Sequence, residues 1–393
     1  MLNNLSFKKG FRFGSLFYLC AFSVALWGCN SDSSKMQIAS AAIIVRADTL
    51  PVPQAAPAVL PETEPTEPQS FTVIGVGDMM LGTNYPSASY LPPNGGRNLL
   101  DEAREILKSA DVTFGNLEGT ILDKGGTPKR CNNPAACYVF RSPESYVQHF
   151  VDAGFDFLSV ANNHSGDFGY EGRSRTKALL AEAGIAFAGL AGTNEYAIIE
   201  RDGVKYGMAA FAPNSGTCSI HDLGKARAIV SKLDQECDIV IVSFHGGAEG
   251  ASHQNVPRHS ETYFGENRGD VYKFSHAVVD AGADIVFGQG PHVTRAMELY
   301  KDRLICYSLG NFCTYGRFSL SGPAGFAPIV AVRVDKQGAF LGGEVTPIYQ
   351  QKAHGPKIDA QKRATLKLIE LTQADFPETP LEITKEGKLL KKG

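Results

Sequence analysis

The stretch "SVANNHSGDFG", Ser159 to Gly169, begins inside the apolar run "FDFLSVA" (155–161) and continues with two asparagines, one histidine and one aspartate. The aromatic and aliphatic residues of the run are typical of a buried β-strand. In open α/β folds, ligands bind where strands reach their carboxyl ends. The stretch therefore predicts a functional site directly after a strand.

Polar clusters follow five other predicted strands in the same way. Together with the first, they are "GDMM" (77–80), "GNLEG" (115–119), "ANNHSGD" (161–167), "HGGAEG" (245–250), "GQGPH" (288–292) and "SLGNF" (308–312). Because the carboxyl ends of parallel strands point to one edge of a sheet, these clusters are expected to meet there. The residues expected at this common edge are Asp78, Asn116, Glu118, Asn163, His164, His245 and His292.

Between Phe71 and about Glu344, short β-rich runs alternate with amphipathic stretches of helical period. This alternation indicates an α/β fold. Residues 325–350 instead alternate apolar and polar side chains around Gly338, which predicts an antiparallel hairpin and hence a mixed sheet. The alternative is a TIM barrel, which needs eight βα units where only about six can be counted.

The side chains of the clusters have a common chemistry. Carboxylate, imidazole and amide groups form a mixed nitrogen and oxygen site suited to Mn, Zn or Fe, and the absence of cysteine argues against a structural zinc site. Two such ions would generate hydroxide and hold a phosphoryl or acyl oxygen. Simpler interpretations remain, since Asp78 and Asn116 could cap helices and a lone histidine is often structural. Three histidines at equivalent strand ends favour the site.

The ordered motifs carry a family resemblance. They are "GDMMLG", "GNLEGTI", "ANNHSGDFG", "HGG", "GPHV" and "YSLGNF", between Phe71 and about Pro347. In this order they resemble the CapA/PgsA family of poly-γ-glutamate capsule biosynthesis proteins, which is related in fold to the calcineurin-like metallophosphoesterases. The resemblance implies a four-layer αββα arrangement, in which a mixed β-sheet sandwich is flanked by helices.

The resemblance also implies a role for each candidate residue. Asp78 and His292 would hold a first metal ion, Glu118 would stand at the bridging position, and Asn163 and His245 would serve a second ion. His164 would be the catalytic residue that protonates a leaving group or stabilises charge.

Two positions depart from the phosphoesterase pattern. The Asp-x-His element is Asp78-Met79-Met80, and Gln289 and Gly290 stand where relatives often place a histidine. Fewer strong ligands bind metal more weakly, so one or two divalent ions are expected, and the sequence leaves open whether the site catalyses hydrolysis.

Anion-binding groups are also present near the motifs. The arginines concerned are Arg141, Arg258, Arg268 and Arg295. Their forked donors suit an anionic substrate, although each taken alone is more typical of a solvated surface charge. Arg295 and Asn311 are the predicted substrate contacts, and Asn311 could equally be a turn residue.

The first residues form an export signal. Lys8, Lys9 and Arg12 precede "LFYLCAFSVALWGC" (16–29), an apolar run too short to span a bilayer comfortably. Its end resembles a bacterial lipobox, with Cys29 as the lipidated residue. The alternative is an uncleaved signal anchor, and both interpretations tether the protein outside the cytoplasm, facing the periplasm or the cell exterior.

The expected domain organisation follows from these composition changes. Residues 1–29 are a lipoprotein signal peptide, 30–70 a disordered proline-rich linker, 71–356 the folded CapA-type domain, and 357–393 a C-terminal helix with a frayed tail. Cys131 and Cys137 bracket a polar loop and are candidates for a disulfide in an oxidising compartment.

Net charge and motifs together limit the possible functions of the protein. The formal net charge of −3 is too small to indicate a nucleic-acid partner. The leading hypothesis is an envelope-tethered protein in the biosynthesis, export or attachment of an anionic capsule polymer such as poly-γ-glutamate, within a capsule synthesis or export complex. The alternatives are a metal-dependent envelope hydrolase of phosphoesters or amides, and a non-catalytic polymer-binding module with a degenerate metal site.

Overall fold

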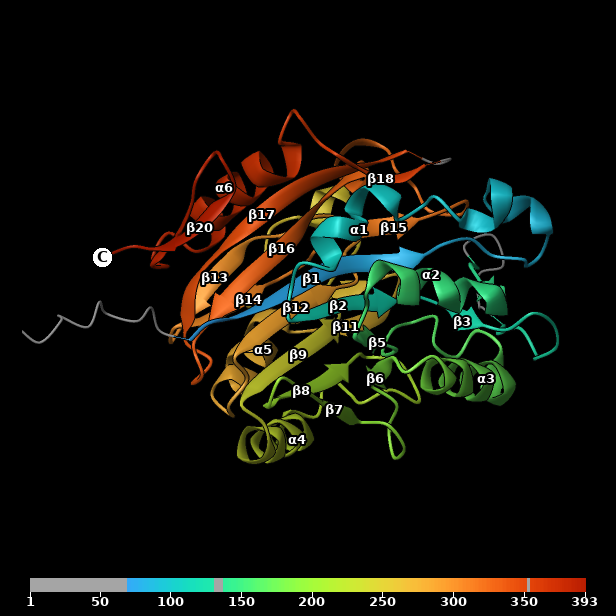
Figure 1. Cartoon of the computed structure of the whole chain (residues 1–393), viewed down its shortest axis with the longest axis horizontal. Coiled ribbons are helices and arrows are strands. Elements are labelled where there is room, and N and C mark those ends of the chain that lie inside the picture. Colours follow the sequence, from blue (N-terminus) through green and yellow to red (C-terminus); the bar gives the residue numbers. More distant parts are fainter. Residues whose placement is uncertain (1–68, 131–136, 352–353) are drawn as a thin grey trace, which may run out of the picture. The chain divides into compact units, whose positions relative to one another are not determined.

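The computed structural model describes residues 69–130, 137–351 and 354–393, which form two large β-sheets with helices on their outer faces (Figure 1). The predicted signal peptide, Cys29 and almost all of the predicted linker lie outside the described residues. The first strand begins at Phe71, where the sequence turns from polar to apolar.

The first sheet is built around β1 (Phe71–Met80), whose residues are almost all buried. Parallel strands follow on one side: β2 (Val112–Leu117), β5 (Phe157–Ser159) and β6 (Ala186–Ala188). Antiparallel strands follow on the other: β16 (Phe326–Val334), β17 (Phe340–Gln351), β20 (Lys388–Lys391) and β19 (Leu381–Ile383). Two short strands pair off this path: β15 (Asn311–Thr314) with β1, and β18 (Gly355–Ile358) with β17. The predicted hairpin around Gly338 is thus confirmed as β16 and β17.

The second sheet has a parallel centre and antiparallel edges. Its order is β13 (Met297–Tyr300), β14 (Arg303–Cys306), β12 (Ile285–Gln289), β9 (Ile239–His245), β8 (Val204–Phe211) and β7 (Tyr196–Arg201). The pairs between β8, β9, β12 and β14 are parallel, whereas β7 and β13 run antiparallel to their neighbours. Both sheets are therefore mixed, as the sequence predicts.

The two sheets pack face to face through apolar side chains. Phe114 of β2 stacks on Phe287 of β12 with ring centroids 5.4 Å apart. Val73 and Ile241 belong to the same fully buried cluster. Full burial of each such side chain contributes about 1.5–3 kcal/mol relative to exposure, so this layer holds the sandwich together.

Helices cover both outer faces and complete a four-layer αββα arrangement. α1 (Asp101–Leu107), α2 (Val147–Ala153) and α3 (Gly169–Glu182) lie on the first sheet, while α4 (Leu223–Glu236) and α5 (Val271–Val279) lie on the second. α6 (Arg363–Asp375) contacts strands of both sheets. The predicted sandwich flanked by helices is confirmed, and the TIM barrel is wrong.

Short elements connect these layers. The 3₁₀ helices are η1 (Ala88–Tyr90), η2 (Pro93–Gly96), η4 (Glu144–Tyr146), η5 (Ala251–His253) and η6 (Gly322–Gly325). Two small hydrogen-bonded pairs are β3 (Thr120–Ile121) with β4 (Arg141–Ser142), and β10 (Glu261–Tyr263) with β11 (Glu266–Gly269). Across the ranges that the structure describes, every helix falls short of the length and hydrophobicity that crossing a membrane requires.

The C-terminal tail differs from the expectation of a frayed end. Its strands β19 and β20 extend the first sheet, and Leu381, Ile383 and Leu389 pack in the core between the sheets. The alternation of buried and exposed residues in "LEI" is the period of a strand, and "KLLK" buries only Leu389, but each run is too short to be recognised without its partner.

Cys137 is disulfide-bonded, and Cys218, Cys237, Cys306 and Cys313 are free. Cys131 lies outside the described residues, so its pairing with Cys137 stays a prediction.

Adjacent leucines test whether the tail is part of the core. Leu389 is fully buried, whereas Leu390 is 45% exposed. Leu389→Ala is expected to lower the free energy of unfolding by about 2–5 kcal/mol, and Leu390→Ala by less than about 0.5 kcal/mol. Urea denaturation of both variants measures the difference, and equally small losses would show that the tail is frayed.

Candidate metal centre

The candidate site lies where strands of both sheets reach their carboxyl ends. Asp78 on β1 pairs in register with Asn116 on β2, and His245 is the last residue of β9. Glu118 follows β2 by one residue, and His292 follows β12 by three. Asp78, Glu118 and His245 are buried to 1% exposure or less. The topology thus brings together polar residues that are far apart in the sequence.

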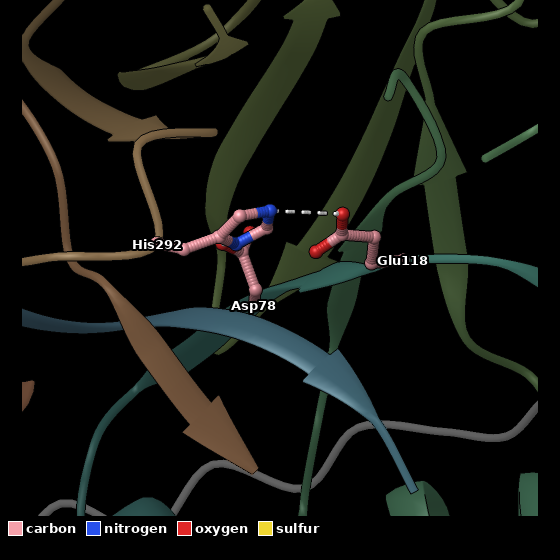
Figure 2. A group of neighbouring side chains, drawn as sticks. All are labelled: Asp78, Glu118 and His292. Atoms are coloured by element: carbon pink, nitrogen blue, oxygen red, sulfur yellow. Dashed lines mark hydrogen bonds and ion pairs between the residues drawn. The ribbon is translucent and has the colours of Figure 1, made fainter. Parts of the chain in front are cut away.

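Asp78, Glu118 and His292 form the centre of the cluster (Figure 2). One ligand atom from each lies within 4.8 Å of the others. The His292 ring lies between the two carboxylates, with Nδ1 2.9 Å from Asp78 Oδ2 and Nε2 3.6 Å from Glu118 Oε1. His245 lies beside them, with Nδ1 3.9 Å from Asp78 Oδ1.

Several buried atoms around this centre have no hydrogen-bond partner among the described residues. They are both carboxylate oxygens of Glu118 and His245 Nε2, and Asn163 Oδ1, next to His164 in the sequence, is a further buried atom of this kind. Leaving one buried polar group unpaired costs about 1–3 kcal/mol, so an unsatisfied group of this kind requires an explanation. Carboxylate, amide oxygen and imidazole nitrogen are all ligands of Mn, Zn and Fe. The residues therefore fit a divalent cation, which would satisfy these atoms.

Asparagines hold the carboxylate of Asp78 in place. Asn116 Nδ2 donates to Asp78 Oδ1 at 2.8 Å, and Asn162 Nδ2 donates to Asn116 Oδ1 at 3.1 Å. Asn162 Oδ1 also accepts from the backbone N–H of His164 at 3.1 Å. Asn162 thus connects the loop after β5 to the ligand shell, a role that the sequence does not assign to it.

Backbone geometry places His292. Its φ of 57° lies in the left-handed region, which a non-glycine residue adopts only when its surroundings hold it there. Asn311 Nδ2 donates to the His292 carbonyl at 3.2 Å and to the Ala324 carbonyl at 3.2 Å. Asn311, expected as a substrate contact or a turn residue, therefore orients His292, while its buried Oδ1 has no partner in the described ranges.

Burial sets the electrostatics of the centre. It raises the pKa of Glu118, and the nearby Asp78 raises it further against the opposing charge of His292. Burial alone would lower the pKa of His292, but the Glu118 charge and the Asp78 hydrogen bond outweigh it and raise the pKa to about 10. Burial also lowers the pKa of His245 well below its usual range, so that its ring is neutral. In the absence of a cation, His292 is therefore the protonated group that balances the carboxylates.

His164 faces the same centre from the loop after β5. Its Nδ1 lies 2.7 Å from Asp167 Oδ2, and its Nε2 lies 3.8 Å from Glu118 Oε1. Lys129 Nζ lies 2.6 Å from Asp167 Oδ1 and 3.3 Å from His164 Nδ1. A carboxylate that binds one ring nitrogen fixes the orientation of the other. Sequence reasoning gave no role to Asp167 or Lys129, although the His-x-x-Asp spacing within one turn was a signal for the former.

The departures at Gln289 and Gly290 have a steric explanation. Gly290 has a φ of 110°, and a Cβ there would lie 2.8 Å from the backbone nitrogen of Gly246. No histidine fits at this position. The fully buried Gln289 instead contacts Ser243 Oγ at 2.9 Å inside the sheet.

Arg295 is not placed as expected. Its guanidinium is fully buried and makes a bidentate ion pair with Glu261, with Nη1 and Nη2 each 2.8 Å from a carboxylate oxygen. Its Nε donates to the His253 carbonyl at 2.8 Å. All three nitrogens are engaged inside the protein, so Arg295 has a structural role. A buried ion pair needs a carboxylate partner far away in sequence, which no local pattern reveals.

The family described as "Bacterial capsule synthesis protein PGA_cap" matches residues 72–315, more than half of the chain. The chain belongs to this family. The match spans β1 to β15 and includes all five predicted metal ligands, His164, Arg295 and Asn311. The expected family resemblance is therefore confirmed.

Curated relatives include the capsule biosynthesis protein CapA of Bacillus anthracis, which is 28% identical over 63% of this chain and 60% of its own length. The PGA biosynthesis protein CapA of Bacillus subtilis is 25% identical over 60% of this chain and 61% of its own length. The chain thus matches about 60% of the length of these relatives.

Similar solved structures include a phosphatase from Mycoplasma pneumoniae, 16% identical with a TM-score of 0.46 over 77% of this chain and 100% of that chain. Another is the calcineurin-like phosphoesterase YfkN from Bacillus subtilis, 12% identical with a TM-score of 0.38 over 74% of this chain and 88% of that one.

Removing a ligand tests the metal assignment. His292→Ala and Glu118→Ala are each expected to weaken Mn or Zn binding by at least about 10–100-fold, the loss seen even for groups behind the ligands. Binding to the parent chain should release protons and weaken as the pH falls, because the metal displaces the proton of His292, whose pKa is about 10. Titration calorimetry in buffers of different ionisation enthalpy measures both effects.

His276→Ala is the matched control, since His276 also pairs with a carboxylate, Glu298, at 2.9 Å, but lies on α5. Metal binding that is equal in all three variants and the parent chain would contradict the assignment.

Proposed function

We propose that this chain acts in the synthesis, export or attachment of an anionic capsule polymer, such as poly-γ-glutamate, through a divalent-metal centre. The observation that carries the proposal is the cluster of the buried Asp78 and Glu118 with the partly buried His292, which contains possible ligand atoms without hydrogen-bond partners among the described residues. Membership of the capsule synthesis family and the names of the CapA relatives support the polymer pathway.

The residues divide into those that would hold a cation and those that would act on the ligand. Asp78, Glu118 and His292 would hold it, with His245 adjacent and Asn163 as a further proposed ligand. When bound, the cation would polarise a carboxylate, amide or phosphoryl oxygen. Asn116 and Asn162 keep the Asp78 carboxylate in position.

A second candidate function is metal-dependent hydrolysis of an amide or a phosphoester in the cell envelope. The pair of His164 and Asp167 favours it, because Asp167 fixes the ring and leaves Nε2 on the side of Glu118. Burial lowers the pKa of His164 against the opposing effect of Asp167, so the ring is neutral near neutral pH, with Nδ1 toward Asp167 and Nε2 able to accept a proton. A group that accepts a proton here and returns it to a leaving group can take part in general acid–base catalysis.

His164→Ala separates these functions. If His164 transfers a proton, the variant keeps its metal while turnover of a γ-glutamyl amide or a phosphoester falls by about 10²–10⁴-fold. Metal content by elemental analysis and product release are measured on the same samples. Asp167→Asn is the accompanying variant, in which the ring stays but its orientation is released.

Three other results are informative. Metal that is lost together with activity would make His164 a ligand, and full activity of His164→Ala would end the catalytic function. If the parent chain binds metal and polymer but turns over neither substrate, the binding module is favoured over the hydrolase. A parent chain that binds neither metal nor polymer would contradict the proposed function.

We also propose that the protein is exported and held at the membrane by a lipid on Cys29, beside a capsule synthesis complex. The basic residues, the short apolar run and the terminal "ALWGC" support this, together with the proline-rich stretch that would separate the anchor from the folded domain.

Substitution of Cys29 tests the proposed lipid anchor. Cys29→Ser is expected to release the protein from membranes or to leave an unprocessed precursor, because the acceptor thiol is removed. Cys20→Ser, inside the apolar run, is the matched control and should behave as the parent chain. Membrane fractionation and the size of the product give the answer. Unchanged processing and retention in Cys29→Ser would exclude lipidation at this residue.

A further inference from the structure

Arg268 is a buried arginine on β11, only 2% exposed. Its Nε donates to the Gly247 carbonyl at 3.2 Å, and its Nη1 lies 3.0 Å from Glu249 Oε1. The Gly247 N–H in turn donates to the Arg268 carbonyl at 2.9 Å. These contacts fasten β11 to the loop that follows β9, directly after His245.

The third nitrogen of Arg268, Nη2, is buried and has no hydrogen-bond partner in the described part of the chain. An arginine stays charged at every working pH, so a buried donor left unpaired is unfavourable. Arg295 is the useful comparison, because it is equally buried in the same region but has every nitrogen engaged. The fold can therefore engage every nitrogen of a buried arginine, and at Arg268 it leaves one nitrogen, Nη2, without a partner among the described residues.

Arg268 lies close to the metal centre. It is hydrogen-bonded to Gly247, two residues after His245. A Cβ at Gly246, the residue between them, would lie 2.8 Å from the Arg268 carbonyl oxygen. A positive donor thus stands next to the residues that would hold a cation.

From this geometry we propose that Arg268 Nη2 donates a hydrogen bond to an anionic oxygen of the ligand at the metal centre, and that this oxygen belongs to a carboxylate of the polymer. With Nε and Nη1 anchored, the planar guanidinium presents Nη2 in a fixed direction, which suits a carboxylate. A γ-linked glutamate chain keeps one free α-carboxylate on each residue. The identity of the polymer rests on the proposed function, whereas the contact with an oxyanion does not.

The test measures anion binding to the purified, Mn-loaded full chain by calorimetry, with two probes: inorganic phosphate and a γ-linked glutamate oligomer. Arg268→Gln is expected to weaken binding of both by about 10–100-fold, the loss of a charge-assisted hydrogen bond. Its metal content, measured in parallel, should not change. Arg258→Gln is the matched control, because Arg258 is half exposed and pairs with Glu378 on the surface, and it should bind both probes as the parent does.

Arg268→Lys covers the case in which Arg268→Gln does not fold. The lysine keeps the positive charge beside Glu249, so the variant is expected to fold and to retain metal. It should still bind both probes about tenfold more weakly, since one ammonium cannot reproduce the anchored fork.

Parent-like affinity for both probes in the folded Arg268 variants would overturn the inference. So would a loss of metal that accounts for the loss of anion binding, because Arg268 would then only support the ligands. If phosphate binding depends on Arg268 but the oligomer does not bind even to the parent chain, the oxyanion contact stands. The polymer carboxylate, and with it the proposed function, would then be wrong.

Discussion

Two carboxylates, Asp78 and Glu118, are buried at the edge where both sheets end, and the surrounding structure is arranged around that constraint. A buried carboxylate is stable as an ion only when positive charge or hydrogen-bond donors replace water. Asn116 supplies a donor to Asp78, and the protonated His292 lies between the two acids. Glu118 receives no hydrogen bond among the described residues. Because Glu118 lacks hydrogen-bond donors, the binding of a divalent cation beside it would be favourable.

The site depends on the packing of the two sheets, because its ligands come from both. Asp78 and Glu118 belong to the first sheet and the loop behind it, while His245 and His292 belong to the second. The stacked rings of Phe114 and Phe287 join these sheets beneath the site. A Cβ at Gly75 would lie 2.5 Å from the Phe287 ring, so the absence of a side chain on β1 permits this contact. Loosening the sandwich would separate imidazoles from carboxylates, so binding of a cation at this site would be coupled to folding.

The sequence predicts the parts of this arrangement that follow from local periodicity and parallel topology. Strand runs that end in polar clusters indicate a common edge, and the structure places Asp78, Glu118 and His292 there. The sequence does not predict contacts between residues that only the fold brings together. Nothing in the sequence separates Arg295 from Arg268, yet Glu261 and two backbone carbonyls engage all three nitrogens of the first, whereas Glu249 engages one nitrogen of the second. The sequence does not predict the C-terminal strands, because β20 is recognisable only through its pairing with β17.

Holding a cation and transferring a proton depend on different parts of this chain. The candidate ligands come from several strands, so their arrangement requires the whole sandwich. His164 instead is oriented by Asp167, three residues away, and Asp167 in turn pairs with Lys129. A substitution in that turn would therefore affect the proposed proton transfer and leave the cluster of Asp78, Glu118 and His292 intact. The same buried carboxylates would then serve either of the two proposed functions, polymer binding or polymer cleavage. In the functions proposed above, the cation and Arg268 would supply the charge that holds an anionic ligand, and His164 would supply the capacity to cleave it.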